Sequence, residues 1–445
     1  MASTYLSRST ASGTDTVWTW SGWLKRSKLS SSQTFFGTGN GSSSANSLQI
    51  RFSDDDTLDY RNFVSSSYNG RLSGGRKYRD TSAWYHFVFV WDTTQASSGN
   101  RMKAYCNGET ITGFTDIQDP GLNSSAHTSG SSTFIGTDGY GGSTYFDGCL
   151  SHVHFIDGTA YDPTVFGETD ATTGEWKGKT SPSVTYGTNG FFILKDGNGI
   201  TDQSGEGNDF TLGGGTLTDL KDNPDNVFAT FNPLAQTNSG SLLKFGNTKT
   251  SNTSNVGQTN YISTLGMASG KFYFEAKMDN VGTNNSGSAP YVGVFAYPSY
   301  TGSQYVGDTG GAGYNTGGYI YNNGGSGTNT GTTYTDTDVI GCAVDLDNNK
   351  IYWHKNGTYV NAGSGIGNPT TGANGYDISN ITALGDIGFC VSGYQINAEW
   401  ACNFGNGYFG TTAVSSAGTN ASEIGIFEYD VPTGYTALST KGLNE

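Results

Sequence analysis

The sequence predicts an all-β protein made of two antiparallel β-sandwich (jelly-roll) domains in tandem, with little helix. Glycine accounts for 67 of the 445 residues, and charged residues make up only 14%, against roughly 25% in an ordinary globular chain. Gly, Ser, Thr, Asn and Asp clusters interrupt short apolar runs, and no window keeps the i, i+3, i+4, i+7 repeat of an amphipathic helix. At about 100–200 residues per domain, this length predicts two or three domains.

Strands of the first domain are expected from Val17 onward. The segment Val17–Arg26 (VWTWSGWLKR) has apolar residues on both faces of a period-two pattern, which is typical of a central sandwich strand. Further strands are predicted at Leu48–Phe52, Ala83–Trp91 and Met102–Thr110. Within the last of these, Asn107-Gly108 is a strong signal for a two-residue hairpin turn.

A second set of strands with its own hairpin signal predicts a second domain. Gly270–Met278 (GKFYFEAKM) alternates as a half-buried strand does. Strands are also expected at Tyr291–Tyr297, Asp338–Asp345 and Lys350–Lys355, and the last is followed by Asn356-Gly357. Between the two sets, Gly190–Leu194 is expected to form one strand in an otherwise turn-rich stretch.

The succession of a Trp-rich strand, a W-x-H-F strand and a Y-x-N-G hairpin resembles the laminin-G-like, concanavalin-like jelly roll over residues 1–168. The order G-K-x-Y-x-E, V-G-V and DVIGCAVDLDNNKIYWHKNG closely resembles the SPRY domain over residues 241–445. Residues 169–240 are interpreted as a turn-rich closing segment and connector. Tyr145–Glu168, Gly187–Phe210 and Asp222–Leu234 further resemble a module of structural proteins of tailed phages, above all marine ones.

The phage resemblance implies a virion structural protein, such as a tail fiber, a capsid appendage or a decoration protein. Its expected partners are other virion proteins and host cell-surface glycan, and a homo-oligomer, with a trimer as one form, is expected. The N-terminal MASTYLSRST lacks the basic stretch and apolar core of a signal peptide. The expectation is therefore a protein made in the host cytoplasm and carried on the virion.

Charge and hydropathy exclude other classes of partner. The formal net charge is −15, and acidic residues outnumber basic ones on both sides of Leu234, whereas nucleic-acid binding depends on clustered Lys and Arg. No run approaches the ~18 apolar residues that span a bilayer. We therefore expect neither a nucleic-acid partner nor membrane insertion. Five cysteines without CxxC spacing predict neither a disulfide framework nor a zinc knuckle, and most are expected to be buried.

A Gly- and Tyr-rich stretch between Tyr297 and Asp336 is the strongest candidate for a contact surface. One interpretation is a ligand or partner loop, because tyrosine gives broad amphipathic contact at low entropic cost. The alternative is glycine-punctuated strands whose tyrosines pack within the domain. On the first interpretation the contact residues are Tyr300, Tyr305, Tyr314, Tyr319 and Tyr321.

Metal binding has two candidate sets of residues. Laminin-G-like domains frequently hold Ca²⁺ by loop oxygens, so the resemblance suggests calcium at Asp54, Asp55, Asp56, Asp138 and Asp147, with solvated loop carboxylates as the alternative. His152 and His154 alternate in one predicted strand and are expected to share a face. Hydrogen-bonded surface histidines are the alternative to zinc there. No other cofactor is expected.

Catalysis is not predicted. Glycan hydrolysis needs two carboxylates roughly 5–9.5 Å apart, and the D-x-D pairs Asp336/Asp338 and Asp345/Asp347 fall at strand ends or hairpin turns, where Asp usually bonds turn backbone. No G-x-S-x-G nucleophile motif stands between a strand and a helix. The favoured hypothesis is therefore a non-enzymatic binding protein. The alternative is a carbohydrate-active enzyme, a polysaccharide depolymerase on the virion.

Overall fold

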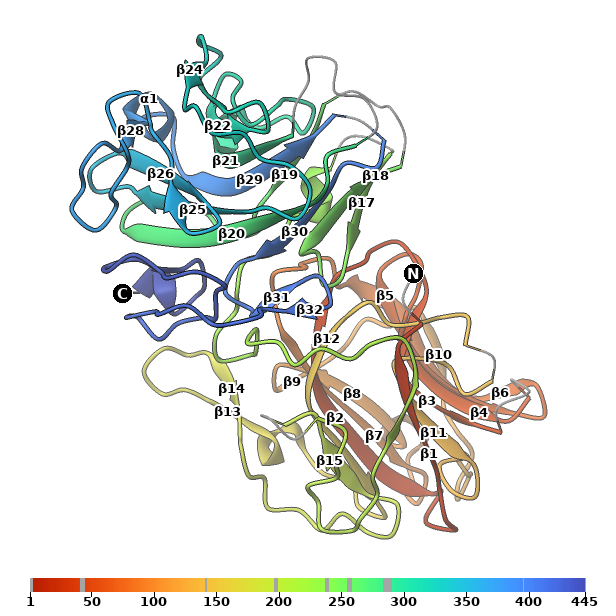
Figure 1. The fold of residues 1–445 in the computed structure, drawn as a ribbon. Coiled ribbons are helices and arrows are strands. Elements are labelled where there is room, and N and C mark those ends of the chain that lie inside the picture. Colours follow the sequence, from red (N-terminus) through yellow and green to blue (C-terminus); the bar gives the residue numbers. More distant parts are fainter. Residues whose placement is uncertain are drawn as a thin grey trace. The chain divides into compact units, whose positions relative to one another are not determined.

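The computed structural model describes residues 3–40, 45–140, 142–195, 199–236, 240–253, 258–282, 290–394 and 396–444 (Figure 1). It is nearly all-β, with 43% strand and 5% helix, as the sequence predicts. The chain divides into two compact units, residues 1–219 and 220–445. In the described residues no helix is long and apolar enough to cross a membrane. The helical segments are α1 (Ser379–Thr382), η1 (Ser98–Asn100), η2 (Pro163–Val165), η3 (Pro233–Ala235), η4 (Tyr297–Ser299) and η5 (Gly442–Asn444).

The first unit contains two large antiparallel sheets (Figure 1). The eight-stranded sheet has the order β10 (Asp116–Gln118), β6 (Ser67–Lys77), β5 (Thr57–Val64), β4 (Ser47–Phe52), β3 (Gln33–Gly39), β11 (Ser132–Ile135), β1 (Tyr5–Ser9) and β16 (Thr211–Gly214). The six-stranded sheet has the order β15 (Phe191–Ile193), β12 (Gly148–Asp157), β2 (Val17–Arg26), β7 (Tyr85–Asp92), β8 (Met102–Cys106) and β9 (Glu109–Thr110). A small hairpin joins β13 (Gly167–Thr169) and β14 (Trp176–Gly178).

Aromatic side chains from both sheets form the core of the first unit. Trp18 and Trp20 of β2 are fully buried, and the Trp18 ring lies 6.5 Å from that of Trp91 in a stacked arrangement. Phe35 and Phe36 of β3 reach the same core from the other sheet. The prediction of a central strand at β2 is confirmed, because β2 pairs with β12 on one side and with β7 on the other.

Both predicted hairpin turns are confirmed by their backbone. Asn107 and Gly108, between β8 and β9, have φ angles of 50° and 82°. Asn356 and Gly357 have φ angles of 48° and 83°. Asparagine and glycine tolerate this left-handed conformation, which matches the twist of the paired strands.

The segment 169–240, expected as a closing segment and connector, is shared between the two units, and the boundary lies between residues 219 and 220. Phe191 of β15 and Phe210 are buried in the core of the first unit. Phe228 and Phe231 are buried in clusters of the second unit. Residues 196–198 and 237–239 of this segment lie outside the described residues.

The second unit repeats the two-sheet plan (Figure 1). One sheet has the order β17 (Ser241–Lys244), β18 (Lys249–Asn252), β30 (Glu399–Asn403), β20 (Lys271–Asn280), β25 (Val339–Asp345), β26 (Lys350–Lys355) and β27 (Thr358–Tyr359), with β28 (Tyr376–Asp377) beside β26 and β33 (Thr436–Ala437) beside β20. The other has the order β19 (Thr259–Ile262), β29 (Ile387–Gly393), β21 (Tyr291–Ala296), β22 (Gly311–Asn315), β23 (Tyr319–Asn322) and β24 (Thr328–Asn329). A hairpin joins β31 (Tyr408–Phe409) and β32 (Thr412–Ala413).

Strand β20 packs on both of its faces. Phe272, Phe274 and Ala276 point into the main core between the sheets. Tyr273 lies in a second cluster, where it meets Phe427 of the C-terminal segment with ring centroids 5.0 Å apart. The C-terminal segment therefore covers the outer face of this sheet, and β33 pairs with β20 in parallel.

The described cysteines are all free, and Cys106, Cys342, Cys390 and Cys402 are buried, which confirms that most serve as small apolar side chains. Cys390 donates to the Asn260 side chain across 2.7 Å. Burial raises the pKa of the Cys390 and Cys402 thiols well above the usual value, so both stay protonated.

Glu275 of β20 holds the C-terminal segment in place. Its fully buried carboxylate accepts hydrogen bonds from the backbone N–H groups of Glu428 (2.9 Å) and Tyr429 (2.8 Å). The Tyr273 hydroxyl (3.0 Å) and the Asn403 amide (3.4 Å) also donate to it. No cation forms an ion pair with Glu275 in the described residues. Burial raises the pKa of Glu275 to about 7, against the opposing effect of these donors.

Glu275 should make the second unit less stable as pH rises. The pKa is higher in the folded state than the ordinary value of 4.5 for a glutamate, so the stabilising contribution is fully present below pH 4.5 and is lost as pH rises through about 7. The shift corresponds to on the order of 3 kcal/mol. We expect Glu275→Gln to flatten the decline in unfolding free energy between pH 5 and pH 8, measured by urea unfolding of the whole chain.

Glu423→Gln is the matched control, because it removes an exposed carboxylate from the same unit. The control should keep the pH dependence of the unchanged protein. An equal pH dependence in Glu275→Gln would contradict the assignment to Glu275.

Candidate functional site

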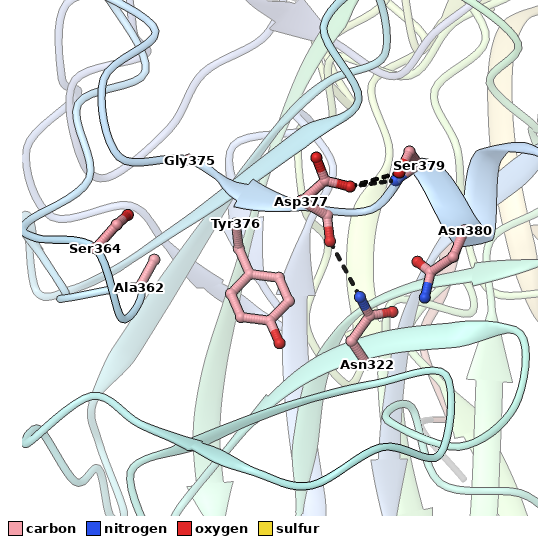
Figure 2. Close-up of a pocket in the computed structure, with 8 residues that line it drawn as sticks. All are labelled: Asn322, Ala362, Ser364, Gly375, Tyr376, Asp377, Ser379 and Asn380. Carbon is pink, nitrogen blue, oxygen red and sulfur yellow. Dashed lines mark hydrogen bonds between the residues drawn. The ribbon is translucent and has the colours of Figure 1, made fainter.

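A shallow polar pocket lies in the second unit beside β23 and β28, with a cavity volume of about 500 Å³. Figure 2 shows the residues that line it. They come from the end of β23, the loop before β28, β28 itself and the start of α1: Asn322, Ala362, Ser364, Gly375, Tyr376, Asp377, Ser379 and Asn380.

Strand β28 positions the pocket floor by pairing with β26, where Tyr376 is opposite Ile351 and Asp377 is opposite Lys350. Asp377 accepts hydrogen bonds from the Ser379 backbone N–H (3.0 Å) and hydroxyl (2.6 Å). Lys350 Nζ lies 2.8 Å from its other carboxylate oxygen. These partners, the lysine first, lower the pKa of Asp377 to about 2, so it stays charged at neutral pH.

Asn322 joins the two sides of the pocket, because its Nδ2 donates to the Asp377 backbone carbonyl across 3.0 Å (Figure 2). Tyr376 extends from β28 toward the side of the pocket where Asn322 lies (Figure 2). Its ring packs edge-on against Trp353, with centroids 6.4 Å apart, and is half-buried. An aromatic face beside amide and hydroxyl groups can stack on and hydrogen-bond a polar ligand.

The predicted tyrosine contact loop needs a correction. Part of the stretch from 297 to 336 forms β22, β23 and β24, so the interpretation as glycine-punctuated strands describes it better. Tyr314 of β22 is fully buried in the main core, and its hydroxyl donates to the Thr332 carbonyl across 2.6 Å. Tyr300 uses its hydroxyl within the unit, on the Asn260 carbonyl at 2.6 Å. Tyr314 is therefore not available as a contact surface, whereas the half-buried Tyr300 has its hydroxyl engaged within the unit.

The other three predicted tyrosines also keep part of their surface exposed. Tyr319 is 38% exposed, and its ring lies 6.3 Å from that of Tyr321. Tyr305 and Tyr321 both pack against Tyr291, with centroids 5.1 and 5.9 Å away. The strand structure of β22 and β23 explains why Tyr314 points inward and Tyr319 outward, which a loop interpretation does not predict.

The aspartates suggested for calcium have protein partners. Asp56 is buried and lies 3.0 Å from Arg26 and 3.3 Å from Arg79. Asp55 accepts from the hydroxyl of Thr57 at 2.7 Å, and Asp54 is exposed. These contacts hold Asp55 in a turn with Thr57 and pair Asp56 with two arginines.

Asp138 and Asp147 belong to a different segment. The buried Asp138 accepts from the Gly142 backbone (3.0 Å) and the Thr144 hydroxyl (3.0 Å). Burial raises the pKa of Asp147. In the part of the chain that the structure describes, no three His, Cys, Asp or Glu side chains form a group able to hold a metal ion.

The expectation that His152 and His154 alternate regularly on one strand needs a correction. A register shift falls between Ser151 and His154, and His152 has a φ of 49°, so a bulge interrupts the alternation. His154 is buried, stacked on Phe192 at 3.9 Å and hydrogen-bonded to the Tyr186 hydroxyl at 2.9 Å. Burial lowers its pKa well below the usual value, so this imidazole is neutral.

A buried serine–histidine contact also occurs in the first unit. Ser21 Oγ lies 2.9 Å from His86 Nε2, and Trp176 Nε1 donates to His86 Nδ1 across 3.0 Å. The indole donor assigns the histidine proton to Nε2, so His86 donates to Ser21 and cannot take the serine proton there. This arrangement is structural.

The aspartates of the D-x-D pairs accept hydrogen bonds from turn backbone or form ion pairs with lysine. Asp345 is fully buried and lies 3.0 Å from Lys271 Nζ, and Asp347 accepts from the Gly270 backbone at 2.9 Å. Asp338 pairs with Lys355 at 3.0 Å, and Asp336 accepts from the Val281 backbone at 2.7 Å. These carboxylates therefore serve strand ends, as their sequence positions suggest.

Both β-sandwiches match models of known domains. Residues 2–165 match the concanavalin A-like lectin/glucanases superfamily, and residues 271–364 match the SPRY domain. The chain thus carries a concanavalin-like domain followed by a SPRY domain. Lectin-like and SPRY domains indicate binding or protein interaction.

Similar solved structures cover parts of the chain. The SPRY domain of human HERC1 is 19% identical and covers 39% of this chain and 96% of its own, with a TM-score of 0.29. A human SPRY domain is 16% identical, with coverages of 38% and 96% and a TM-score of 0.28. The SAP-like pentraxin from Limulus polyphemus is 18% identical, with coverages of 34% and 69% and a TM-score of 0.27. Comparison with curated proteins gave no match.

Two tyrosines from the predicted loop should differ sharply in their effect on stability. Tyr314→Ala removes a fully buried ring from the core and should lower the unfolding free energy by about 3–5 kcal/mol. Tyr319→Ala removes a side chain that is 38% exposed and should cost less than about 1 kcal/mol. Urea unfolding of each variant gives the comparison, and equal losses would contradict the inward and outward assignment.

Proposed function

We propose that the chain is a non-enzymatic binding protein of a virion, serving as a tail fiber, capsid appendage or decoration protein. In this role it attaches to host cell-surface glycan or to neighbouring virion subunits. The observation that carries the binding role is the pocket at β28, where Tyr376 presents an aromatic ring beside Asn322 and the Asp377–Ser379 turn. The virion setting rests on the resemblance of the two sandwiches and their junction to phage structural modules.

Multivalency supports the particle setting. A shallow, polar pocket offers limited burial for a ligand, and single sites of this kind bind sugars weakly, near the millimolar range. Many copies on one particle raise the avidity by orders of magnitude without new contacts. A homo-oligomer carried on a virion, with a trimer as one form, would supply those copies.

The alternative function is a polysaccharide depolymerase with the same folds. In the described residues the four D-x-D carboxylates bond turn backbone or lysine, and none of them lines the β28 pocket. Asp377 does line the pocket, but Lys350 and Ser379 keep its pKa low, which suits a fixed anion better than a general acid. These contacts favour binding over hydrolysis.

Polysaccharide incubated with the pure protein should keep its chain length. Reducing ends are the readout, followed over hours with a panel of neutral and acidic polysaccharides. A steady increase that Asp377→Asn or Asp345→Asn abolishes would overturn the non-enzymatic proposal in favour of the depolymerase.

Tyr376→Ala should weaken attachment to host cells or to isolated surface glycan about fivefold, because one stacking contact contributes on the order of 1 kcal/mol. Binding is measured with the whole chain at matched concentration, and thermal unfolding confirms that the variant is folded. Tyr319→Ala is the matched control, since it removes an exposed tyrosine of the same unit that does not line the pocket. If Tyr319→Ala weakens binding and Tyr376→Ala does not, the pocket is not the site.

A further inference from the structure

A cluster of three arginines lies on the outer face of the eight-stranded sheet in the first unit. Leu48, Ile50, Leu58, Tyr60 and Leu72 of β4, β5 and β6 point into the core. Side chains alternate along a strand, so Arg51, Asp59, Arg61 and Arg71 lie on the opposite face. We call Arg51, Arg61 and Arg71 the arginine cluster.

The strand register brings these side chains into two rows. Arg51 is opposite Asp59, and Asp59 is opposite Ser73. In the next row Gln49 is opposite Arg61, and Arg61 is directly opposite Arg71. Like charges placed directly opposite each other on neighbouring strands are destabilising, so this row is costly for the fold on its own.

One buried carboxylate stands at the centre of the arginine cluster. The Asp59 side chain is 0% exposed and lies 3.1 Å from Arg51 Nε, 3.2 Å from an Arg61 terminal nitrogen and 3.0 Å from Arg71 Nε. A single ion pair would be enough to compensate the buried Asp59 charge. Even with Asp116, which pairs with Arg71, the cluster keeps one net positive charge.

The guanidinium groups of Arg61 and Arg71 are held in fixed orientations. Arg61 donates through two nitrogens to the side-chain oxygen Oε1 of Gln49, at 2.6 and 3.1 Å, and lies over the Phe63 ring at 5.2 Å. Arg71 lies over the Tyr68 ring at 4.7 Å, and these two rings pack 4.6 Å apart. Fixed guanidinium groups lose little freedom when they bind a further anion.

Arg51 retains free donors. Its Nε contacts Asp59, while its two terminal nitrogens donate to no group in the described part of the chain, and the side chain is 17% exposed. Terminal nitrogens of a guanidinium match the spacing of two oxygens on one carboxylate or sulfate. The cluster therefore offers a planar pair of donors at the surface, next to surplus positive charge.

The distribution of arginine along the chain agrees with a local role. All eight arginines lie between Arg8 and Arg101, and the second unit contains only lysine as its strong base. The net charge of −15 repels acidic ligands in general, but at physiological salt such repulsion is screened beyond about 8 Å. Contacts at the cluster can then decide whether an anion binds.

We propose that the arginine cluster binds the acidic group of a polysaccharide, a uronic acid carboxylate or a sulfate ester, with Arg51 as the principal contact. Phe63 and Tyr68 lie two rows further along the strands, against Arg61 and Arg71. This inference rests on the proposed glycan-binding function and adds an acidic ligand class and a second site in the first unit. The Phe63 and Tyr68 rings are half-buried and can pack against a sugar ring.

The test measures binding of the whole chain to polygalacturonate, dextran sulfate, uncharged dextran and polyglutamate by calorimetry at two salt concentrations. Binding to at least one of the two acidic polysaccharides, which weakens with salt, is expected, and the two arms identify carboxylate or sulfate as the preferred group. Arg51→Gln should weaken that binding on the order of tenfold. The matched control Arg76→Gln removes an equal charge from an exposed position of β6 and should leave it unchanged.

Several results would overturn the inference. Equal loss in the Arg51→Gln and Arg76→Gln variants would mean that only overall charge matters, and polyglutamate bound as tightly as polysaccharide would make the ligand an acidic protein.

If Arg51→Gln does not fold, Arg51→Lys keeps the charge, loses the paired donors and should still weaken binding. Failure to bind either acidic polysaccharide, with host attachment through the Tyr376 pocket intact, would overturn this inference alone. Loss of every glycan interaction would overturn the proposed function too.

Discussion

Burial of large aromatic side chains between two sheets is the interaction on which both units depend. In the first unit Trp18, Trp20 and Trp91 fill the space between the sheets. In the second unit Trp353 and Trp400 do so, and each donates its indole N–H to a backbone carbonyl of the facing sheet, Val292 at 3.1 Å and Ser392 at 3.0 Å. Because these rings hold the strands together, the loops between the strands tolerate almost any composition. Glycine and serine are concentrated in those loops.

Each unit also buries a carboxylate, Asp59 in the first and Glu275 in the second, and the groups that stabilise the two carboxylates differ. Asp59 is surrounded by guanidinium groups, more of them than one carboxylate needs. Glu275 has no ion pair in the described residues and is held by two backbone N–H groups, a tyrosine and an asparagine. The first arrangement leaves an excess of positive charge on the outer face of the sheet. The second fixes the C-terminal segment on the second unit.

The sequence predicted the fold well because period-two alternation and Asn-Gly turns are local signals. Strand β20 begins and ends within two residues of the expected segment, and both Asn-Gly hairpins form as predicted. The site was predicted less well. The Gly-Tyr stretch lacks long apolar runs, so its sequence left both a contact loop and glycine-punctuated strands open. In the structure GAGYN and YIYN form paired strands that place Tyr314 inside and Tyr319 outside.

The pocket at β28 could not be found from spacing, because Asn322 and Asp377 are far apart in sequence and meet only through strand pairing. The D-I-S sequence at residues 377–379 was an available signal, since Asp and Ser in this spacing commonly form a side-chain-capped turn. The arginine cluster could not be predicted from the sequence either. Its three members come from three strands, and only the register reveals that they share a face.

The contacts around Glu275 give its hydrogen bonds a single direction. The Gly357 backbone N–H donates to His354 Nδ1, so the histidine proton lies on Nε2, which is 2.6 Å from the Tyr273 hydroxyl. The hydroxyl proton is then left for Glu275. All groups that contact the Glu275 carboxylate are donors, so a proton bound to Glu275 finds no acceptor among them. If Tyr273 and His354 reversed their hydrogen bonds to accept it, His354 Nδ1 would carry a hydrogen that faces the Gly357 N–H. Protonation of Glu275, in the middle of β20, is therefore coupled to the hairpin turn at Asn356-Gly357 through the hydrogen bonds of Tyr273 and His354.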